Sequence, residues 1–155
     1  MTNSSLTPGQ RALRKGRFSE AGRIYHVTAT TFQRSAIFED FRAARCLVAE
    51  LRAMQDEGWA NTLAWVVMPD HLHWLIELGS HDLARTLQRV KSRSAIHINR
   101  LRGTKGQFWQ PGYYDHALRR DEDLREVARY IAANPLRAGL VRHLGDYPHW
   151  DAIWL

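Results

Sequence analysis

Residues 59–78, WANTLAWVVMPDHLHWLIEL, decide the fold. Two apolar runs, residues 59–68 and 71–78, flank Pro69 and Asp70, and these two residue types favour a tight turn. Each run predicts a strand. The short turn between them predicts that the two strands form an antiparallel hairpin.

Strand and helix patterns alternate on both sides of this hairpin. A β-branched and aromatic alternation predicts a strand at residues 23–31, and a helical apolar period follows until Gly58 stops the helix after Glu57. Beyond the hairpin, the same reasoning predicts a second helix at residues 82–101 and a short strand at residues 113–118.

A third helix follows the short strand. Asp121 is its predicted N-cap, and the helix should end near Asn134 because Pro135 disfavours helical geometry in the residue before it. Residues 136–155 hold short apolar pieces that predict no particular element. The order strand, helix, strand, strand, helix, strand, helix favours a ferredoxin-like α+β fold, an antiparallel sheet with helices packed mainly on one face.

The length of the chain favours one domain with a basic arm. With 155 residues and 45% hydrophobic composition, the chain can build one compact core and is too short for two ordinary domains. We expect this domain at residues 23–155 and an arm, which could equally be a solvated tail, at residues 1–22. Candidate phosphate contacts in the arm are Arg11, Arg14, Lys15 and Arg17.

Charge and cysteine content bound the partners and the compartment. The 22 Lys and Arg residues exceed the 16 Asp and Glu residues, and the net charge of +6 favours a polyanionic partner such as nucleic acid. The single cysteine, Cys46, excludes an internal disulfide and fits the reducing cytoplasm. No stretch approaches the roughly 20 apolar residues that cross a bilayer, so we expect a cytoplasmic protein without a membrane partner.

The predicted second strand of the hairpin carries a His-x-His pair. Residues two apart on a strand project from the same face, so His71 and His73 point together while Leu72 points to the opposite side. If the helices cover the side of Leu72, the two imidazoles lie on the open face as a ready clamp for a metal ion. Such a pair alone also fits histidines with a purely structural role.

Tyr130 and Asn134 lie four residues apart on the predicted third helix, and therefore on the same side of it. The apolar stripe of that helix consists of Leu124, Val127, Ala128 and Ile131. Tyr130 falls on the shoulder of this stripe, where a tyrosine can pack its ring and still present its hydroxyl group to a cleft.

Three stretches together, MPDHLHWLIEL at 68–78, FWQPGYYDHALR at 108–119 and YIAANPLRAGLV at 130–141, resemble the REP-associated tyrosine transposases. This family is related to the IS200-type single-tyrosine transposases and belongs to the HUH nuclease superfamily. The resemblance runs from about Leu13 to Tyr147, nearly the whole chain.

The resemblance implies a function and a site. His71 and His73 would bind a divalent metal, Mg²⁺ or Mn²⁺, and Tyr130 would attack single-stranded or hairpin DNA to give a 5′-phosphotyrosine and a free 3′-hydroxyl. Asn134 stands where relatives place a glutamine as third metal ligand, and His116 is a further candidate ligand or phosphate contact. Members of the wider family act as monomers or as homodimers, and either state is open here.

Basic and aromatic residues supply candidate DNA contacts. Arg89 and Arg93 lie on the polar face of the second predicted helix, and Trp109 and Tyr114 could stack on unpaired bases. Packing within the protein is the other reading of these aromatic residues.

Two other functions remain open from the residues. A small hydrolase could use the His-x-His pair to hold zinc, although the apolar continuation HLHWLI disfavours the metallo-β-lactamase pattern. A non-catalytic module could bind nucleic-acid hairpins and use the histidines only structurally. Metal-dependent nicking of DNA would separate the transposase from this module.

Overall fold

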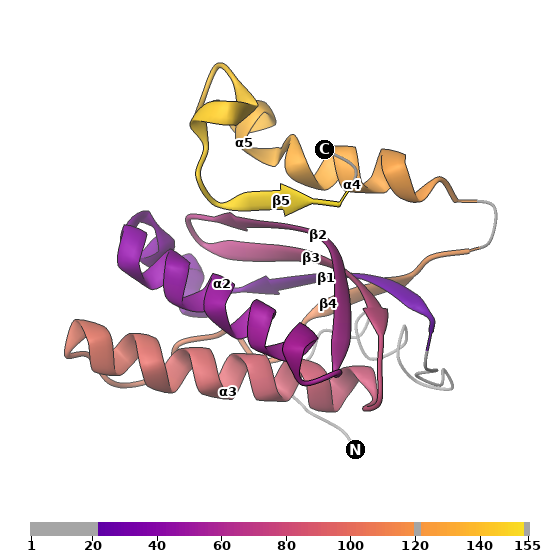
Figure 1. Ribbon diagram of the computed structural model, residues 1–155. Coiled ribbons are helices and arrows are strands. Elements are labelled where there is room, and N and C mark those ends of the chain that lie inside the picture. Colours follow the sequence, from indigo (N-terminus) through magenta and orange to yellow (C-terminus); the bar gives the residue numbers. More distant parts are fainter. Residues whose placement is uncertain (1–21, 120–121, 154–155) are drawn as a thin grey trace.

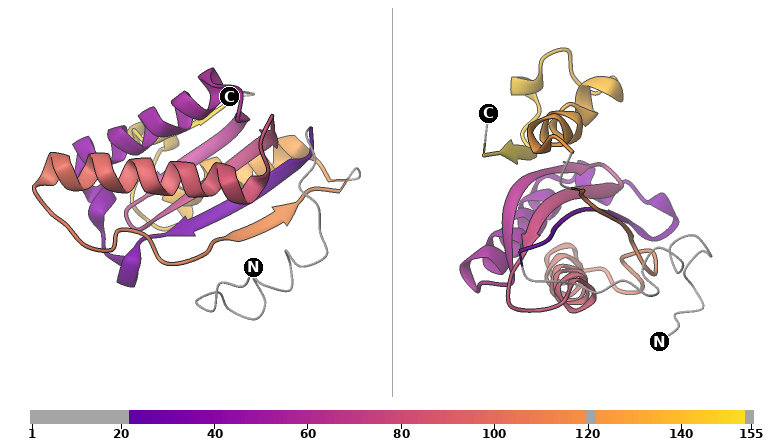
Figure 2. Two further views of the ribbon diagram at one scale, coloured as in Figure 1. Left: turned by 90° about the horizontal axis from the view of Figure 1, so that it is seen from below. Right: turned by 90° about the vertical axis from the view of Figure 1, so that its right-hand side faces the viewer.

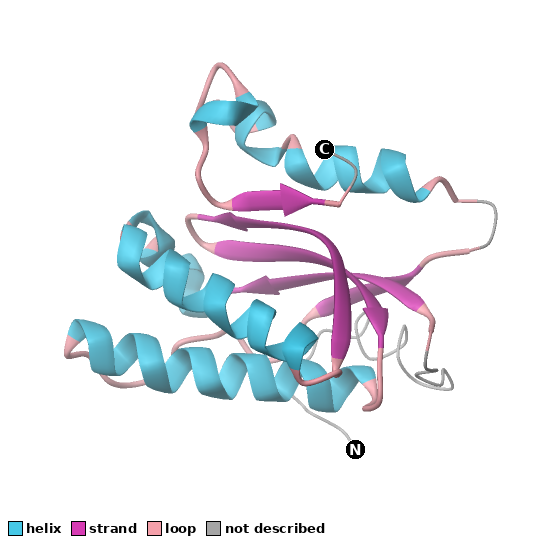
Figure 3. Cartoon of the chain, in the orientation of Figure 1, coloured by secondary structure: helices cyan, strands magenta, loops and turns pink. Residues whose placement is uncertain are grey.

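A five-stranded antiparallel sheet forms the centre of the computed structural model, which describes residues 22–119 and 122–153 (Figure 1, Figure 3). The strand order is β4-β1-β3-β2-β5. The strands are β1 (Ile24–Thr30), β2 (Ala60–Met68), β3 (His71–Leu78), β4 (Tyr114–Ala117) and β5 (Trp150–Ala152). The predicted α+β class with an antiparallel sheet is confirmed, and the first four strands follow the ferredoxin-like connectivity.

Helices lie on both faces of the sheet. The two long helices, α2 (Phe41–Asp56) and α3 (Leu83–Arg102), pack side by side on one face. The shorter α4 (Leu124–Ala132) and α5 (Asn134–Arg137) lie across the other face, next to β2 (Figure 1, Figure 2). Most of the helical residues are thus on one face, as expected, and the third predicted helix is on the opposite one.

The hairpin of β2 and β3 follows its prediction closely. Met68 pairs with His71 across the Pro69–Asp70 turn, and Val66 pairs with His73. Leu72 and Trp74 are almost fully buried in the core beneath α2 and α3, as the alternation along β3 requires. The histidines therefore face the α4 side of the sheet, which confirms the predicted assignment of the two strand faces.

A second, smaller core forms beneath α4. Ala128 and Ile131 of α4 pack against Val66 and Leu75 of the sheet. The other buried members of this core are Leu63, Ala64, Met68, Leu118 and Ala152. α4 covers β2 and part of β3, whereas Tyr114 and His116 of β4 are more than half exposed on this sheet face.

Aspartates begin all three longer helices. The side chains of Asp40, Asp82 and Asp123 accept hydrogen bonds from backbone N–H groups of the first turn. As N-caps, they satisfy N–H groups that have no acceptor within the helix. The predicted N-cap of the third helix, Asp121, lies outside the described residues, and Asp123 takes this role instead. That helix ends near Asn134 as predicted, since α4 ends at Ala132, but the separate helix α5 that begins at Asn134 was not predicted.

The C-terminal segment adds an element that the sequence did not predict. β5 pairs with β2, with Trp150 opposite Val66 and Ala152 opposite Ala64. The hydroxyl group of Tyr147 donates a 2.6 Å hydrogen bond to the carbonyl oxygen of Val67 and fastens this segment to the sheet.

Two sequence predictions concern features that the fold does not test. The basic arm, with Arg11, Arg14, Lys15 and Arg17, lies outside the described residues apart from Gly22. Among the helices of the described chain, none has the length and apolar character needed to cross a membrane.

Candidate active site

A polar group of side chains gathers on the α4 face of the sheet. Thr28 of β1 pairs in register with His73 of β3, and Thr30 pairs with His71, so these side chains share one face. The ring centroids of His71 and His73 lie 4.9 Å apart with planes at 85°. The structure therefore brings the two predicted metal ligands together, next to polar residues of β1.

Asp70 holds His71 from the hairpin turn. The Nδ1 atom of His71 lies 2.7 Å from Oδ1 of Asp70, and Nε of Arg34 donates to Oδ2 at 3.0 Å. Burial opposes the charge of Asp70, but its hydrogen bond with His71 and the charges of His71 and Arg34 outweigh burial and lower the pKa of Asp70. An ionised carboxylate only accepts, so Nδ1 of His71 donates, and the tautomer with its proton on Nδ1 leaves the lone pair of Nε2 for a ligand.

His73 is held in a similar way from β1. Its Nδ1 atom lies 3.0 Å from Nε2 of His26 and 3.0 Å from Oγ1 of Thr28. The tautomer that donates from Nδ1 leaves the Nε2 lone pair of His73 for a cation. Both site histidines thus engage the protein through Nδ1.

Burial keeps the inner histidines neutral. Burial, followed by the charges of His26, His71 and Arg137, lowers the pKa of His73 to about 3. Burial and the charge of His116 lower the pKa of His26 to about 4. A neutral imidazole is the form that binds a metal, so His73 needs no deprotonation at neutral pH.

Tyr130 lies on the exposed side of α4. Its side chain is 59% exposed, and the guanidinium carbon of Arg137 lies 3.8 Å from the centroid of its ring. The charge of Arg137 also reaches His73, where it contributes to the lowered pKa. Arg137 thus lies against the ring of the predicted nucleophile.

Asn134 occupies a different backbone setting from the predicted one. Ala133, with φ −81° and ψ 0°, separates α4 from α5, so Tyr130 and Asn134 do not share one continuous helix. The Nδ2 atom of Asn134 is buried and has no hydrogen-bond partner among the described residues. This end of the amide is therefore available for a further ligand, and a rotated amide would present its oxygen there.

His116 lies one strand further out, on β4. It pairs in register with His26, and its Nε2 atom lies 3.0 Å from the carboxylate of Glu122. The side chain is 56% exposed. His116 therefore shares the face of the histidine pair but already has a carboxylate partner, which a role as metal ligand would have to displace.

The predicted DNA contacts divide between the two faces. Arg89 and Arg93 lie on α3, across the sheet from the histidines, and form ion pairs with Glu57 and Glu50 at 2.9 and 3.0 Å. These partners favour a structural role, and contact of the two arginines with DNA stays a prediction.

The two aromatic residues differ in the same way. Trp109 is 6% exposed and donates from Nε1 to Oγ of Ser94. Its ring is therefore buried in the core and cannot stack on a base, contrary to the prediction. Tyr114 is 51% exposed and pairs with Thr28, which places it on the histidine face. Tyr113, in contrast, is buried in the core beneath α2 and α3.

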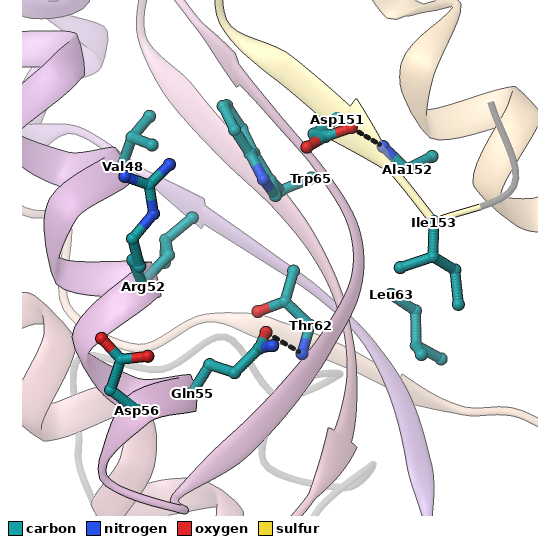
Figure 4. A pocket seen from close by; sticks show the side chains of 11 residues that line it. Val48, Arg52, Gln55, Asp56, Thr62, Leu63, Trp65, Asp151, Ala152 and Ile153 are labelled. Atoms are coloured by element: carbon teal, nitrogen blue, oxygen red, sulfur yellow. Dashed lines mark hydrogen bonds between the residues drawn. The ribbon is translucent and has the colours of Figure 1, made fainter.

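A hollow at the β5 edge of the sheet is separate from this site. It is lined by residues of α2, β2 and the β5 segment, among them Arg52, Thr62 and Asp151, and no residue of the candidate site lines it (Figure 4).

Sequence reasoning missed four residues that shape the site. His26 and Thr28 could have been suspected from their alternation in YHVTATT, but their contact with His73 depends on the register between β1 and β3. Asp70 adjoins His71 in the sequence and was noted only as a turn residue. Arg137 stood in the YIAANPLRAGLV stretch without an assigned role.

Comparison with known proteins places the chain in a family. A family model described as an IS200-like transposase matches residues 21–134. A REP-associated tyrosine transposase of Escherichia coli (strain K12) is 33% identical over 87 residues, which is 55% of this chain and 50% of that protein. The chain spans about half the length of the curated relatives it matches.

Solved structures agree with this assignment. A REP-associated tyrosine transposase bound to a REP hairpin matches with a TM-score of 0.67 and 26% identity, over 86% of this chain and 79% of that one. A candidate transposase of Deinococcus radiodurans matches with a TM-score of 0.55 and 23% identity, over 76% and 95%, and shows the shared fold. Since the family model covers most of the chain, including His71, His73 and Tyr130, the protein belongs to the IS200-like transposase family.

Proposed function

We propose that the protein is a metal-dependent transposase that cuts and rejoins single-stranded DNA through a covalent bond to Tyr130. The observation that carries this proposal is the pair His71 and His73, whose Nδ1 atoms both engage the protein. With their Nε2 atoms on one sheet face, the two rings can serve together as ligands of one cation.

The residues present fit a divalent metal, Mg²⁺ or Mn²⁺. Within residues 22–119 and 122–153, no group of three or more His, Cys, Asp or Glu side chains could hold a metal ion. A third protein ligand would therefore come from an amide, and Asn134 has a buried amide nitrogen without a partner. Nitrogen-rich ligation suits Mn²⁺ better than the oxygen-preferring Mg²⁺. When bound, the cation would polarise the non-bridging oxygens of the phosphate.

The chemistry exchanges one phosphodiester for another. The Oη atom of Tyr130 attacks phosphorus, the bond from phosphorus to the 3′-oxygen breaks, and the phenolic proton ends on the released 3′-hydroxyl. The product is a 5′-phosphotyrosine. A 3′-hydroxyl can attack this bond in reverse, so the strand can be rejoined without another source of energy.

Hairpin DNA is the substrate that we expect. The structural relative bound to a REP hairpin supports this expectation. Tyr114 is exposed on the histidine face, where it could stack on an unpaired base next to the hairpin.

A denaturing gel tests the proposal. The protein is incubated with Mn²⁺ and a hairpin-bearing single strand labelled at its 3′ end, because the tyrosine would stay attached to the 5′-phosphate of that fragment. We expect a labelled band at the combined mass of protein and DNA, which EDTA should abolish. Cutting without an adduct would indicate a hydrolase that uses water, and binding without cutting would indicate the non-catalytic module.

A further inference from the structure

Arg137 differs from several arginines of the fold in its partners. Four of those arginines are paired with carboxylates: Arg34 with Asp70, Arg89 with Glu57, Arg93 with Glu50 and Arg102 with Asp40. Arg137 is exposed, and no carboxylate of the described part of the chain lies within ion-pair distance of it. Its charge is therefore available to an anionic ligand.

The contact that Arg137 does make is with Tyr130. Its guanidinium carbon lies 3.8 Å from the ring centroid, within the range of a cation–π interaction. A guanidinium group that rests on an aromatic ring leaves N–H donors at its rim, and these donors match the geometry of phosphate oxygens.

The backbone around Arg137 fixes the contact. Its amide N–H donates to the carbonyl oxygen of Ala133 at 3.1 Å, and Ala138 donates to Asn134 at 2.9 Å. Pro135, in the same short helix, is buried. The helix α5 thus follows directly on the end of α4 and packs against β2, so Arg137 is presented from a supported element.

Arg137 thus lies directly against the predicted nucleophile. A phosphate that Tyr130 attacks must come close to this guanidinium group.

We propose that Arg137 positions the ring of Tyr130 and binds the scissile phosphate through the rim of its guanidinium group. This inference rests on the proposed function. It assigns a role to a residue three positions beyond the segment that the family model matches, which ends at Asn134.

The variants Arg137→Ala and Arg137→Lys test the inference in full-length protein. We expect Arg137→Ala to slow adduct formation at saturating DNA by about 100-fold to 1,000-fold, the range seen when one transition-state donor is removed. The Kd for DNA should change by less than about 3-fold, since many other phosphate contacts remain. Arg137→Lys should keep part of the rate because it keeps the positive charge. It should not reach the wild-type rate, because it lacks the planar rim of N–H donors.

The control, Arg142→Ala, removes another exposed arginine that makes no contact with the ring of Tyr130.

Rescue separates this role from a structural one. Added guanidinium ion should restore part of the rate of Arg137→Ala and leave the control unchanged, because it can occupy the vacated place. An unchanged rate in Arg137→Ala, or equal losses in Arg137→Ala and Arg142→Ala, would overturn the inference alone. A wild-type protein that forms no adduct would overturn the proposed function, and the inference with it.

Discussion

In His71 and His73, the neighbouring side chains determine which ring nitrogen is left to bind a ligand. Asp70 engages Nδ1 of His71, while His26 and Thr28 lie next to Nδ1 of His73. Each ring can therefore offer only its Nε2 atom to a ligand. Because these partners come from the turn and from β1, they would hold the ligand atoms in place before a metal binds.

Replacing either histidine should remove metal binding and keep the fold. We expect His71→Ala and His73→Ala each to abolish Mn²⁺ binding, measured by calorimetry, and adduct formation, measured on gels. Thermal unfolding should change less than in the control below, because both histidines are only partly buried and alanine leaves no charge in the sheet. The control Leu72→Asp places a charge at a 1% exposed position and should unfold the sheet. Full activity in either histidine variant would contradict the metal assignment.

The nucleophile can be tested by removing one oxygen atom. Tyr130→Phe keeps the ring beneath Arg137 and should eliminate the adduct, while the Kd for DNA changes by only a few-fold. Tyr114→Phe, on the same sheet face, is the matched control and should keep the adduct. Tyr113→Phe should do so as well, since Tyr113 is 7% exposed. An adduct that persists in Tyr130→Phe and disappears in Tyr114→Phe would move the nucleophile to β4.

At the scale of elements, predictability follows the length of the pattern. The strand β1, the hairpin and the two long helices have apolar periods over seven or more residues, and all of them form as expected. The strand β5 has three residues, too few for a period, and exists through pairing with β2 far back in the chain. Long-range pairing of this kind is invisible in a local pattern.

The end of the third helix near Asn134 was predicted, whereas the separate helix α5 that begins at Asn134 was not. Pro135 disfavours helical geometry before it, which argues for an end near Asn134, but proline is also well tolerated in the first turn of a helix. The chain uses the second property and begins α5 there. In the site, His71, His73 and Tyr130 were predictable from spacing and resemblance, whereas the contacts of His26 and Thr28 required the register of β1.

The link between β5 and the sheet can be measured through Tyr147. Removing its hydroxyl in Tyr147→Phe leaves the carbonyl oxygen of Val67 without this donor and should lower the free energy of unfolding by about 1 kcal/mol. Burial raises the pKa of Tyr147 to about 12, while an unfolded tyrosine ionises near pH 10. The folded protein therefore holds the phenolic proton of Tyr147 more tightly than the unfolded chain does. Its contribution to the free energy of unfolding is complete below pH 10 and is lost as the pH rises towards 12.

Urea unfolding of both proteins across this range is the measurement. The stability difference between wild type and Tyr147→Phe should narrow above pH 10. A difference that is constant with pH would show that the hydroxyl group does not carry the effect.

At the scale of the whole molecule, the two faces of the sheet have different charge environments. On the α2 and α3 face, Arg89 and Arg93 are neutralised by Glu57 and Glu50. On the α4 side, Arg137 of α5 forms no ion pair with a carboxylate of the described chain. The net charge of +6 therefore overstates what Arg89 and Arg93 can offer to DNA, and Arg137 and the N-terminal segment stay as predicted sources of attraction.

The contribution of the N-terminal segment can be read from salt dependence. Replacing Arg11, Arg14, Lys15 and Arg17 by glutamine removes four positive charges and keeps the chain length. Each phosphate contact on single-stranded DNA adds about 0.7 to the slope of log K against log salt, so the slope should flatten by up to about 3. Fluorescence anisotropy with labelled DNA over a salt series measures it, and tryptophan fluorescence checks that the variant is folded. An unchanged slope would show that these four residues do not contact DNA.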